Sequence, residues 1–276
     1  MDVLFAQRRR VRSPVGAGMF YPDEKVEILK LLDSFGIEKA NFKQAKAIIA
    51  PHGAWSYSGT LAADAFASAM GRNGIKRAVV LGPIHDKREK GLFLSNSYSF
   101  YTPLGNILVD RKISEQFEKS GESFEINDIP HLGEHSIEIL LPFVKYCFPN
   151  ASIVPVLMGQ PGAQYIYDLA QALKSVISPV IDETLIVVSS NLSCNKDSRT
   201  ARLLAEESLR LFTEMNIPAL TSAILEGRLN ACGGALVVSL LESGLVNNTS
   251  CSAVNSFTSA VSAENNTVYY NGLSFL

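Results

Sequence analysis

The chain has 276 residues, of which 47% are hydrophobic, and its 25 basic and 27 acidic residues give a formal net charge of −2. This length and this apolar content suffice for a packed core, and we expect one domain over residues 1–276. The balanced charge supplies no long-range field toward nucleic acid or an anionic membrane, so neither is an expected partner.

The amino-terminal region and the cysteines favour the cytoplasm. The first residues place apolar side chains before arginines, with no long apolar stretch, so we expect no secretory signal. No run approaches the ~20 apolar residues of a membrane span. The four cysteines show no paired short spacing and predict no disulfide framework, which favours a soluble protein in a reducing compartment. Residues 1–15 are expected to form a solvated basic arm carrying Arg8, Arg9, Arg10 and Arg12.

The first predicted elements bring two histidines to strand ends. We predict a helix at residues 25–35, a buried strand at 47–52, a segment of small residues at 53–59, a helix at 60–70 and a second buried strand at 78–85. Both strands are aliphatic runs without alternating polarity, which is typical of strands covered on both faces. In each, a proline ends the hydrogen-bonding ladder and a histidine follows, His52 in the first and His85 in the second.

From residue 91 onward, strands and helices continue to alternate. We expect an antiparallel excursion at 91–110, a helix that opens at 130–136 and runs to about 146, strands at 152–158, 184–190, 250–257 and 267–270, and helices at 111–119, 163–176, 200–214, 218–225 and 232–243. Alternating strands and helices predict an α/β fold: a single layered domain with a mixed sheet and helices on both faces.

The positions of the histidines indicate one shared site. Ligands of open α/β sheets bind in the crevice outside the carboxyl ends of the strands, so His52 and His85 are expected to face the same place. The other two histidines, His131 and His135, lie where a helix opens. A single histidine is more often a structural hydrogen-bonding residue, but two that follow the same strand and proline pattern favour a functional site.

Two cysteines are candidates to complete this site. Cys194 follows the strand at 184–190 together with Asn191, and Cys232 opens a predicted helix. Imidazoles with a thiolate suit iron, copper or zinc, so we predict a metal site or a former one. Cys232 has two open interpretations: a small buried apolar residue, or a thiolate stabilised by the helix N-terminus and therefore suited to ligation or nucleophilic attack.

The segment His131-Leu-Gly-Glu-His135 matches the H-x-x-E-H pattern of some zinc proteases. We interpret the match as accidental, because that mechanism needs both histidines on one helical face, and Pro130 with Gly133 makes a helix here unfavourable. Glu134 and His135 are instead expected at a helix opening, with His135 pointing into the crevice as a general acid or base. The plainer alternative is that Glu134 caps backbone N–H groups. No phosphate-binding loop, dinucleotide fingerprint or serine-hydrolase elbow occurs.

These residues lie in segments that resemble the Memo family, which includes the bacterial and archaeal AmmeMemoRadiSam system protein B. The resemblance covers nearly the whole chain in order and rests on these segments: Ala17-Gly-Met-Phe-Tyr-Pro22, Ile48-Ile-Ala-Pro-His52, Tyr57-Ser-Gly59, Leu81-Gly-Pro-Ile-His85, Tyr101-Thr-Pro-Leu-Gly105, Glu134-His-Ser-Ile-Glu138, Leu141-Pro142, Val154-Pro-Val-Leu-Met-Gly159, Val188-Ser-Ser190 and Ala231-Cys-Gly233.

The resemblance implies a class III extradiol dioxygenase-like fold with a metal site in the same crevice. In Memo proteins this site has two histidines and a cysteine, which map onto His52, His85 and Cys232. Family members have been linked to copper or iron and to redox chemistry, and the animal protein to phosphopeptide binding in receptor signalling. The resemblance therefore implies a possible metal-dependent oxidoreductase without naming its substrate.

The chain departs from the family pattern next to this site. The family motif Ser-Ser-Asp-x-Ser-His reads Ser189-Ser-Asn191-Leu-Ser-Cys194 here, and Gly53-Ala-Trp55 replaces the usual Ala-Gly-Tyr. Asn191 cannot act as an anionic ligand or base, although its carbonyl can orient a ligand. Cys194 can replace the lost imidazole with a softer thiolate, which would shift the preference toward copper(I) or zinc.

Three functional hypotheses follow. The first is a metal-dependent redox protein with ligands His52, His85, Cys232 and Cys194 and with His135 as acid or base. The second is a binding or scaffold protein without catalysis, in which Trp55 and Tyr57 line a groove for a small molecule or peptide. The third makes Cys232 a nucleophile with His52 or His135 as its base. The departures at Asn191 and Cys194 favour the second.

Overall fold

Four parallel strands form the centre of the largest sheet in the computed structural model, which describes residues 10–40, 42–262 and 264–276. In spatial order they are β2 (Ala47–Ala50), β9 (Thr184–Ser189), β3 (Arg77–Pro83) and β8 (Ser152–Met158). Apart from the first residues of β3 and β8, every residue in them is buried, because helices cover both faces of the sheet. This explains why the strands are continuous aliphatic runs in the sequence.

Antiparallel pairs flank the parallel centre and make the sheet mixed. On one side β14 (Leu273–Phe275) pairs with β2 and also with β11 (Cys251–Ala253). On the other side β4 (Leu92–Leu94) runs antiparallel to β8, and β7 (Phe124–Ile126) lies parallel to β4 at the edge. The eight strands therefore follow the order β11-β14-β2-β9-β3-β8-β4-β7.

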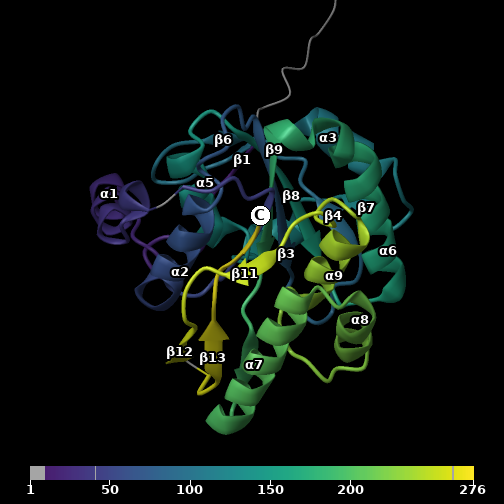
Figure 1. Cartoon of the computed structure of the whole chain (residues 1–276). Coiled ribbons are helices and arrows are strands. Elements are labelled where there is room, and N and C mark those ends of the chain that lie inside the picture. Colours follow the sequence, from purple (N-terminus) through teal and green to yellow (C-terminus); the bar gives the residue numbers. More distant parts are fainter. Residues whose placement is uncertain (1–9, 41, 263) are drawn as a thin grey trace, which may run out of the picture.

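Helices pack on both faces of this sheet (Figure 1). One face is covered by α1 (Lys25–Ser34), α2 (Trp55–Ala67) and α5 (Leu141–Cys147), whose apolar side chains pack with Ile48 and Ala50 of β2. The opposite face packs Ala47 and Ile49 against five helices: α3 (Arg111–Glu118), α6 (Ala163–Ala172), α7 (Ser198–Glu214), α8 (Ile217–Leu225) and α9 (Gly234–Glu242). The predicted α/β domain with a mixed sheet is confirmed, and the arrangement is consistent with a class III extradiol dioxygenase-like fold.

Two small three-stranded sheets complete the strand arrangement. One joins β1 (Val11–Arg12), β5 (Ser99–Phe100) and β6 (Ile107–Leu108). The other joins β10 (Ser193–Asn195), β13 (Thr267–Tyr270) and β12 (Thr258–Val261), and its β12–β13 hairpin lies beside α7 in Figure 1. The remaining helices are short: η1 (Ile37–Lys39), α4 (Ile129–Gly133), η2 (Glu138–Leu140), η3 (Leu173–Ile177) and η4 (Ser178–Glu183).

Three helical predictions need correction. The helix expected from residue 60 begins at Trp55, so part of the predicted small-residue segment is helical. The helix expected to run from 130–136 to about 146 is divided into α4, η2 and α5. The expectation that Pro130 and Gly133 prevent a helix was also wrong, because Pro130 occupies the first turn of α4, where its missing N–H has no intrahelical acceptor to lose.

The basic arm also needs correction at Arg12, which is 2% exposed and forms a buried ion pair with Glu138. Its guanidinium also donates to the carbonyls of His131 (2.9 Å) and Glu134 (2.8 Å). A buried guanidinium is tolerated when a carboxylate and carbonyls satisfy its donors, and here they do. Arg10 is largely exposed and pairs with Asp128, whereas the predictions for Arg8 and Arg9 fall outside the described residues.

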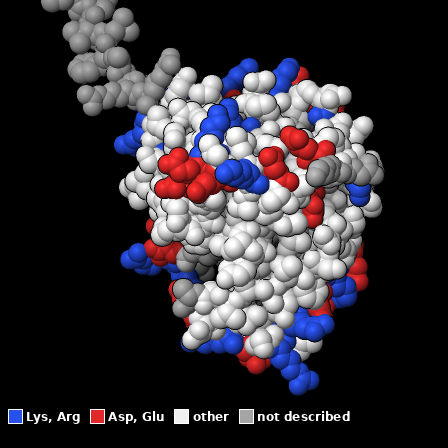
Figure 2. Space-filling view, turned by 90° about the vertical axis from the view of Figure 1, so that its left-hand side faces the viewer, with Lys and Arg blue, Asp and Glu red and all other residues white. Residues whose placement is uncertain are grey.

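The surface view of the α1 and α2 side shows acidic and basic side chains interspersed around a broad uncharged area (Figure 2). This mixture agrees with the small net charge of the chain. Within the described residues, no helix combines the length and the apolar character that crossing a membrane demands.

Candidate metal centre

Three neighbouring strand ends bring the predicted site residues together. His52 follows β2 and His85 follows β3, while β9 lies between these strands and ends at Ser189. Since the three strands are parallel, their carboxyl ends meet at the same edge of the sheet. The imidazole centroids of His52 and His85 are 5.2 Å apart.

Cys232 joins the two histidines from the loop before α9. One nitrogen of His52, one nitrogen of His85 and Sγ of Cys232 all lie within 4.8 Å of one another, and Sγ is 3.3 Å from Nε2 of His52. Gly233 makes this approach possible: a Cβ at this position would lie 2.4 Å from the carbonyl oxygen of Ser189. We call His52, His85 and Cys232 the donor group.

Hydrogen bonds behind the histidines determine which nitrogen faces Cys232. The Ser189 hydroxyl donates to the carbonyl of Ser136 (2.6 Å), so its oxygen accepts from Nδ1–H of His52 (2.7 Å). The Glu134 carboxylate can only accept, so Nδ1 of His85, 3.0 Å away, also carries a hydrogen. We therefore assign Nε2 of both histidines as the atoms that face the donor group, as in metal sites whose imidazoles are oriented from behind.

The donor group is strongly charged. Burial would raise the pKa of Cys232, but the charge on His52 and hydrogen bonds from both histidines lower it to about 5. Burial would lower the pKa of His85, but hydrogen bonds to Cys232 and Glu134 raise it to about 10. Burial would raise the pKa of Glu134, but the hydrogen bond and charge of His85 lower it to about 2. Without a metal ion, the group therefore contains a thiolate beside an imidazolium near neutral pH.

Glu134 and His135 lie directly beside the donor group. Glu134 accepts hydrogen bonds from the backbone N–H groups of His85 (2.7 Å), His135 (2.9 Å) and Ser136 (2.8 Å). It therefore caps backbone groups, as the plainer alternative expected, and also orients His85. The His135 ring stacks between Phe20 (4.7 Å between centroids) and His85 (4.8 Å). Burial and the charge of His52 lower the pKa of His135 to about 4, so this imidazole is neutral near pH 7.

The donor group lines a cavity of about 570 Å³, which we call the main pocket. Tyr57, Asn191 and Cys194 line it, as the sequence predicted for Tyr57 and Asn191. Trp55 does not: it is 2% exposed, packs against Phe143, and donates its indole N–H to the carbonyl of Ile139 (3.2 Å). Since α2 begins at Trp55, the helix turns this side chain into the core between α2 and α5.

Asn191 and Cys194 have different positions in the pocket wall. The side-chain oxygen of Asn191 accepts a hydrogen bond from the backbone N–H of His52 (3.1 Å), and the backbone N–H of Asn191 donates to Sγ of Cys232 (3.1 Å). Asn191 therefore supports two members of the donor group. Cys194 is exposed and lies outside the donor group. Burial, followed by the negative charge of Cys232, raises the pKa of Cys194. The structure therefore does not bring Cys194 into coordination range as the fourth ligand.

His131 is separate from the site. It is 2% exposed, its Nε2 donates to the carbonyl of Phe93 (3.1 Å), and burial lowers its pKa to about 4. His131 and His135 thus have different environments, which agrees with the interpretation of the H-x-x-E-H match as accidental.

Sequence reasoning missed several residues of the site, among them Ser189, Ser136 and Tyr270. Ser189 and Ser136 orient His52, and both stand in segments that also carry the family resemblance, which was their only signal. Tyr270 lines the main pocket from β13. It lies so close to Gly53 that a Cβ there would be 2.6 Å from the Tyr270 ring. No local pattern marks Tyr270, because it reaches the site only through the β12–β13 hairpin.

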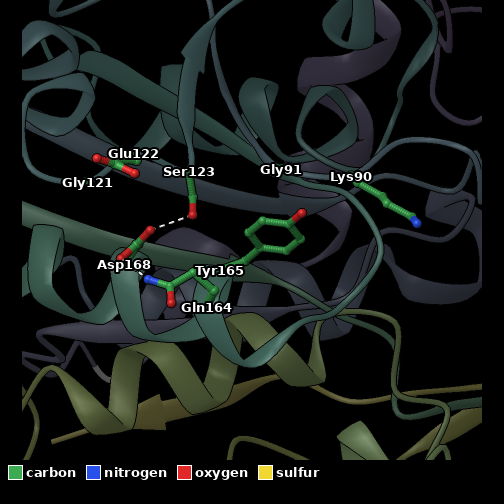
Figure 3. Close-up of a pocket in the computed structure, with 8 residues that line it drawn as sticks. All are labelled: Lys90, Gly91, Gly121, Glu122, Ser123, Gln164, Tyr165 and Asp168. Atoms are coloured by element: carbon green, nitrogen blue, oxygen red, sulfur yellow. Dashed lines mark hydrogen bonds between the residues drawn. The ribbon is translucent and has the colours of Figure 1, made fainter.

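A second cavity, of about 720 Å³, lies at the β4 and β7 side of the sheet, against α6 (Figure 3). Glu122 and Asp168 are its carboxylates, and Asp168 accepts hydrogen bonds from Ser123 and from Gln164 (2.8 Å). The described residues that line this cavity include no histidine or cysteine. It therefore does not offer the donor atoms that characterise the main pocket.

Fold and site together define an α/β protein that presents two imidazoles and a thiol at the carboxyl ends of parallel strands. A family model described as Memo-like protein matches residues 12–273. The chain belongs to the Memo-like family.

Curated relatives support this assignment over most of their length. The chain is 30% identical over 240 residues to a MEMO1 family protein of Aquifex aeolicus, covering 86% of this chain and 87% of the relative. It is 29% identical over 236 residues to one of Methanobrevibacter smithii, with 81% and 83% covered. It is 27% identical over 234 residues to one of Thermoplasma volcanium, with 84% and 85% covered.

Proposed function

We propose that this protein binds one transition-metal ion through Nε2 of His52, Nε2 of His85 and Sγ of Cys232. The observation that carries the proposal is the convergence of these three donor atoms within 4.8 Å, with both imidazoles oriented from behind by Ser189 and Glu134. Two nitrogens and a thiolate suit copper, iron or zinc and do not suit magnesium or calcium. The chemistry of the donor set therefore fits the ion that the family resemblance implies.

The same site supports a role as a metal-dependent oxidoreductase. A bound copper or iron ion would supply redox chemistry, and zinc would supply Lewis acidity, toward a ligand in the main pocket. Glu134 holds His85, and the side chain of Asn191 holds the backbone of His52. His135 is neutral near pH 7 and lines the pocket, so its imidazole can accept a proton from a bound ligand.

Metal analysis of protein purified without chelator tests the proposal. Wild type is expected to hold about one ion per chain, and His52→Ala and Cys232→Ser are expected to lose it. Cys147→Ala is the matched cysteine control, because Cys147 lies in α5 and outside the donor group. Cys194→Ser is expected to keep its ion, since Cys194 is not part of the group. Stoichiometric metal in His52→Ala would contradict the proposal.

A binding protein without catalysis is the second candidate. The observation that favours it is Asn191, whose amide is committed to the backbone of His52 and cannot serve as an anionic ligand or base. In this case the pocket would take a small molecule or peptide without turnover. Protein that binds such a ligand, contains no stoichiometric metal, and keeps its affinity in His52→Ala would favour this candidate.

We also propose a cytoplasmic location. All four cysteines are free thiols, including the exposed Cys194. Exposed free thiols persist in a reducing compartment, whereas oxidising compartments favour disulfides. Fractionation of cells that express the tagged chain would test this placement.

A further inference from the structure

The walls of the main pocket suggest what kind of molecule it takes. Aromatic rings contribute from three separate elements: Phe20 precedes α1, Tyr57 belongs to α2 and Tyr270 to β13. Val261 of β12 and Val268 of β13 add aliphatic surface. A cavity of about 570 Å³ with such walls matches the size and lining of small-molecule sites.

Outside the donor group, the charge on the pocket walls is of one sign. Among the described residues that line the pocket there is no lysine or arginine, and Glu264, in the turn between β12 and β13, is the only carboxylate. Glu264 is exposed, forms no ion pair with a described residue, and accepts a hydrogen bond from the side-chain amide of Asn266 at 3.5 Å. A carboxylate that lines an aromatic pocket without a cationic partner among the described residues favours a positively charged ligand.

A metal ion bound by the donor group would not reverse this balance. The thiolate of Cys232 and the carboxylate of Glu134 together offset the charge of a divalent ion, while His52 and His85 would bind as neutral imidazoles. Glu264 then leaves the pocket with an excess of negative charge. A phosphate or carboxylate ligand would meet this excess without an arginine or lysine to pair with, which is how proteins usually bind such groups.

We propose that the main pocket selects a small organic cation: an amine whose apolar or aromatic body lies against Phe20, Tyr57 and Tyr270 while its ammonium group faces Glu264. Aromatic faces attract both apolar groups and ammonium groups. The apolar body of the ligand and its ammonium group therefore both favour the aromatic walls of the pocket. This ligand class belongs to the site of the proposed function and rests on that function only for the bound ion, because Phe20, Tyr57, Tyr270 and Glu264 line the pocket whether or not an ion is present.

Three probes with one common body test the proposal: tyramine, para-ethylphenol and para-hydroxyphenylpropionate, which carry a positive, a neutral and a negative tail. Kd values are measured by calorimetry and by NMR titration, on metal-free and on zinc-loaded protein. Tyramine is expected to bind about fivefold or more tightly than the propionate, with para-ethylphenol between them. The preference should shrink at high salt, because Glu264 is exposed.

Matched variants assign the preference to the pocket. Glu264→Gln is expected to bring the Kd values of tyramine and para-ethylphenol together, whereas Glu115→Gln, an exposed glutamate on α3, leaves their ratio unchanged. Tyr57→Ala is expected to weaken all three probes. The proposal is overturned if the propionate binds as tightly as tyramine, if no probe binds, or if the ratio of the tyramine and para-ethylphenol Kd values is unchanged in Glu264→Gln.

Metal content tests the proposed function independently. A wild type that holds no metal but prefers tyramine would refute that function and support the ligand class.

Discussion

At the scale of single residues, Ser189 and Glu134 define the site as much as the donor atoms do. Each binds the outward nitrogen of one imidazole and so leaves the inward nitrogen to face Cys232. The strand and proline pattern in the sequence predicted where His52 and His85 would lie. It did not predict their ring orientation, because the partners of both rings come from segments remote in the sequence.

The thiolate character of Cys232 gives a prediction for metal-free protein. Its pKa of about 5 means that the thiolate is fully formed at pH 7, so alkylation by iodoacetamide should be nearly independent of pH above about 6 and should slow as pH falls through 5. The pKa values of Cys194 and Cys147 are raised, so both should react slowly at pH 7. Peptide mass spectrometry reports each rate. Modification of Cys232 no faster than a free thiol would exclude it as a nucleophile and contradict the charged donor group.

At the scale of elements, the segment before α1 is anchored to the loop that carries Glu134 and His135. Glu138 accepts from the buried Arg12, from Tyr21 (2.9 Å) and from the backbone N–H of Gly16 (2.7 Å). Arg12 in turn donates to the Glu134 carbonyl. This network places an amino-terminal strand next to the site, which the sequence did not reveal because Arg12 stands in an arginine-rich segment that is typical of a solvated arm.

Removal of Arg12 should therefore be costly. Arg12→Ala leaves the Glu138 carboxylate buried without its cation and should lower the free energy of unfolding by about 3–5 kcal/mol. Arg10→Ala is the matched control; its exposed guanidinium should contribute less than about 1 kcal/mol. Urea unfolding followed by circular dichroism measures both. Equal losses in the two variants would show that the buried pair does not stabilise the fold.

The elements that sequence reasoning placed well are those with a local signal. The buried strands β2, β3, β8 and β9 are aliphatic runs ended by proline, glycine or polar residues, and each was predicted within a few residues. Strand β13 was also predicted, at residues 267–270, but its pairing with the distant β10, which draws it toward the site, has no local pattern in the sequence. Trp55 was expected in the pocket together with Tyr57, but at the first position of α2 its indole is buried in the core against Phe143.

At the scale of the whole molecule, the buried His131 links stability to pH. Burial lowers its pKa to about 4 in the folded chain, against about 6.5 when unfolded. As pH falls, the unfolded chain therefore takes up the proton before the folded chain does. The contribution of neutral His131 to the free energy of unfolding is complete above pH ~6.5 and falls by up to about 3 kcal/mol toward pH ~4. His131→Gln keeps an N–H donor for the Phe93 carbonyl and does not titrate.

Urea unfolding of metal-free protein between pH 7 and 4 tests this linkage. Wild type should lose more stability over this range than His131→Gln, and the difference should grow below pH ~6.5. His131→Phe removes the donor as well and should be less stable than His131→Gln at every pH. Parallel curves for wild type and His131→Gln would contradict the assigned protonation.

The donor group is assembled from residues scattered between positions 52 and 232, so no single segment of the chain contains it. In the unfolded chain these imidazoles and the thiol are far apart, so an ion binds to it much more weakly than to the folded chain. An ion bound by the folded form would therefore stabilise it against unfolding. The free energy of unfolding would rise by about 2.7 kcal/mol once the free ion concentration is a hundred times Kd. Metal supply and the lifetime of the native protein would then rise and fall together.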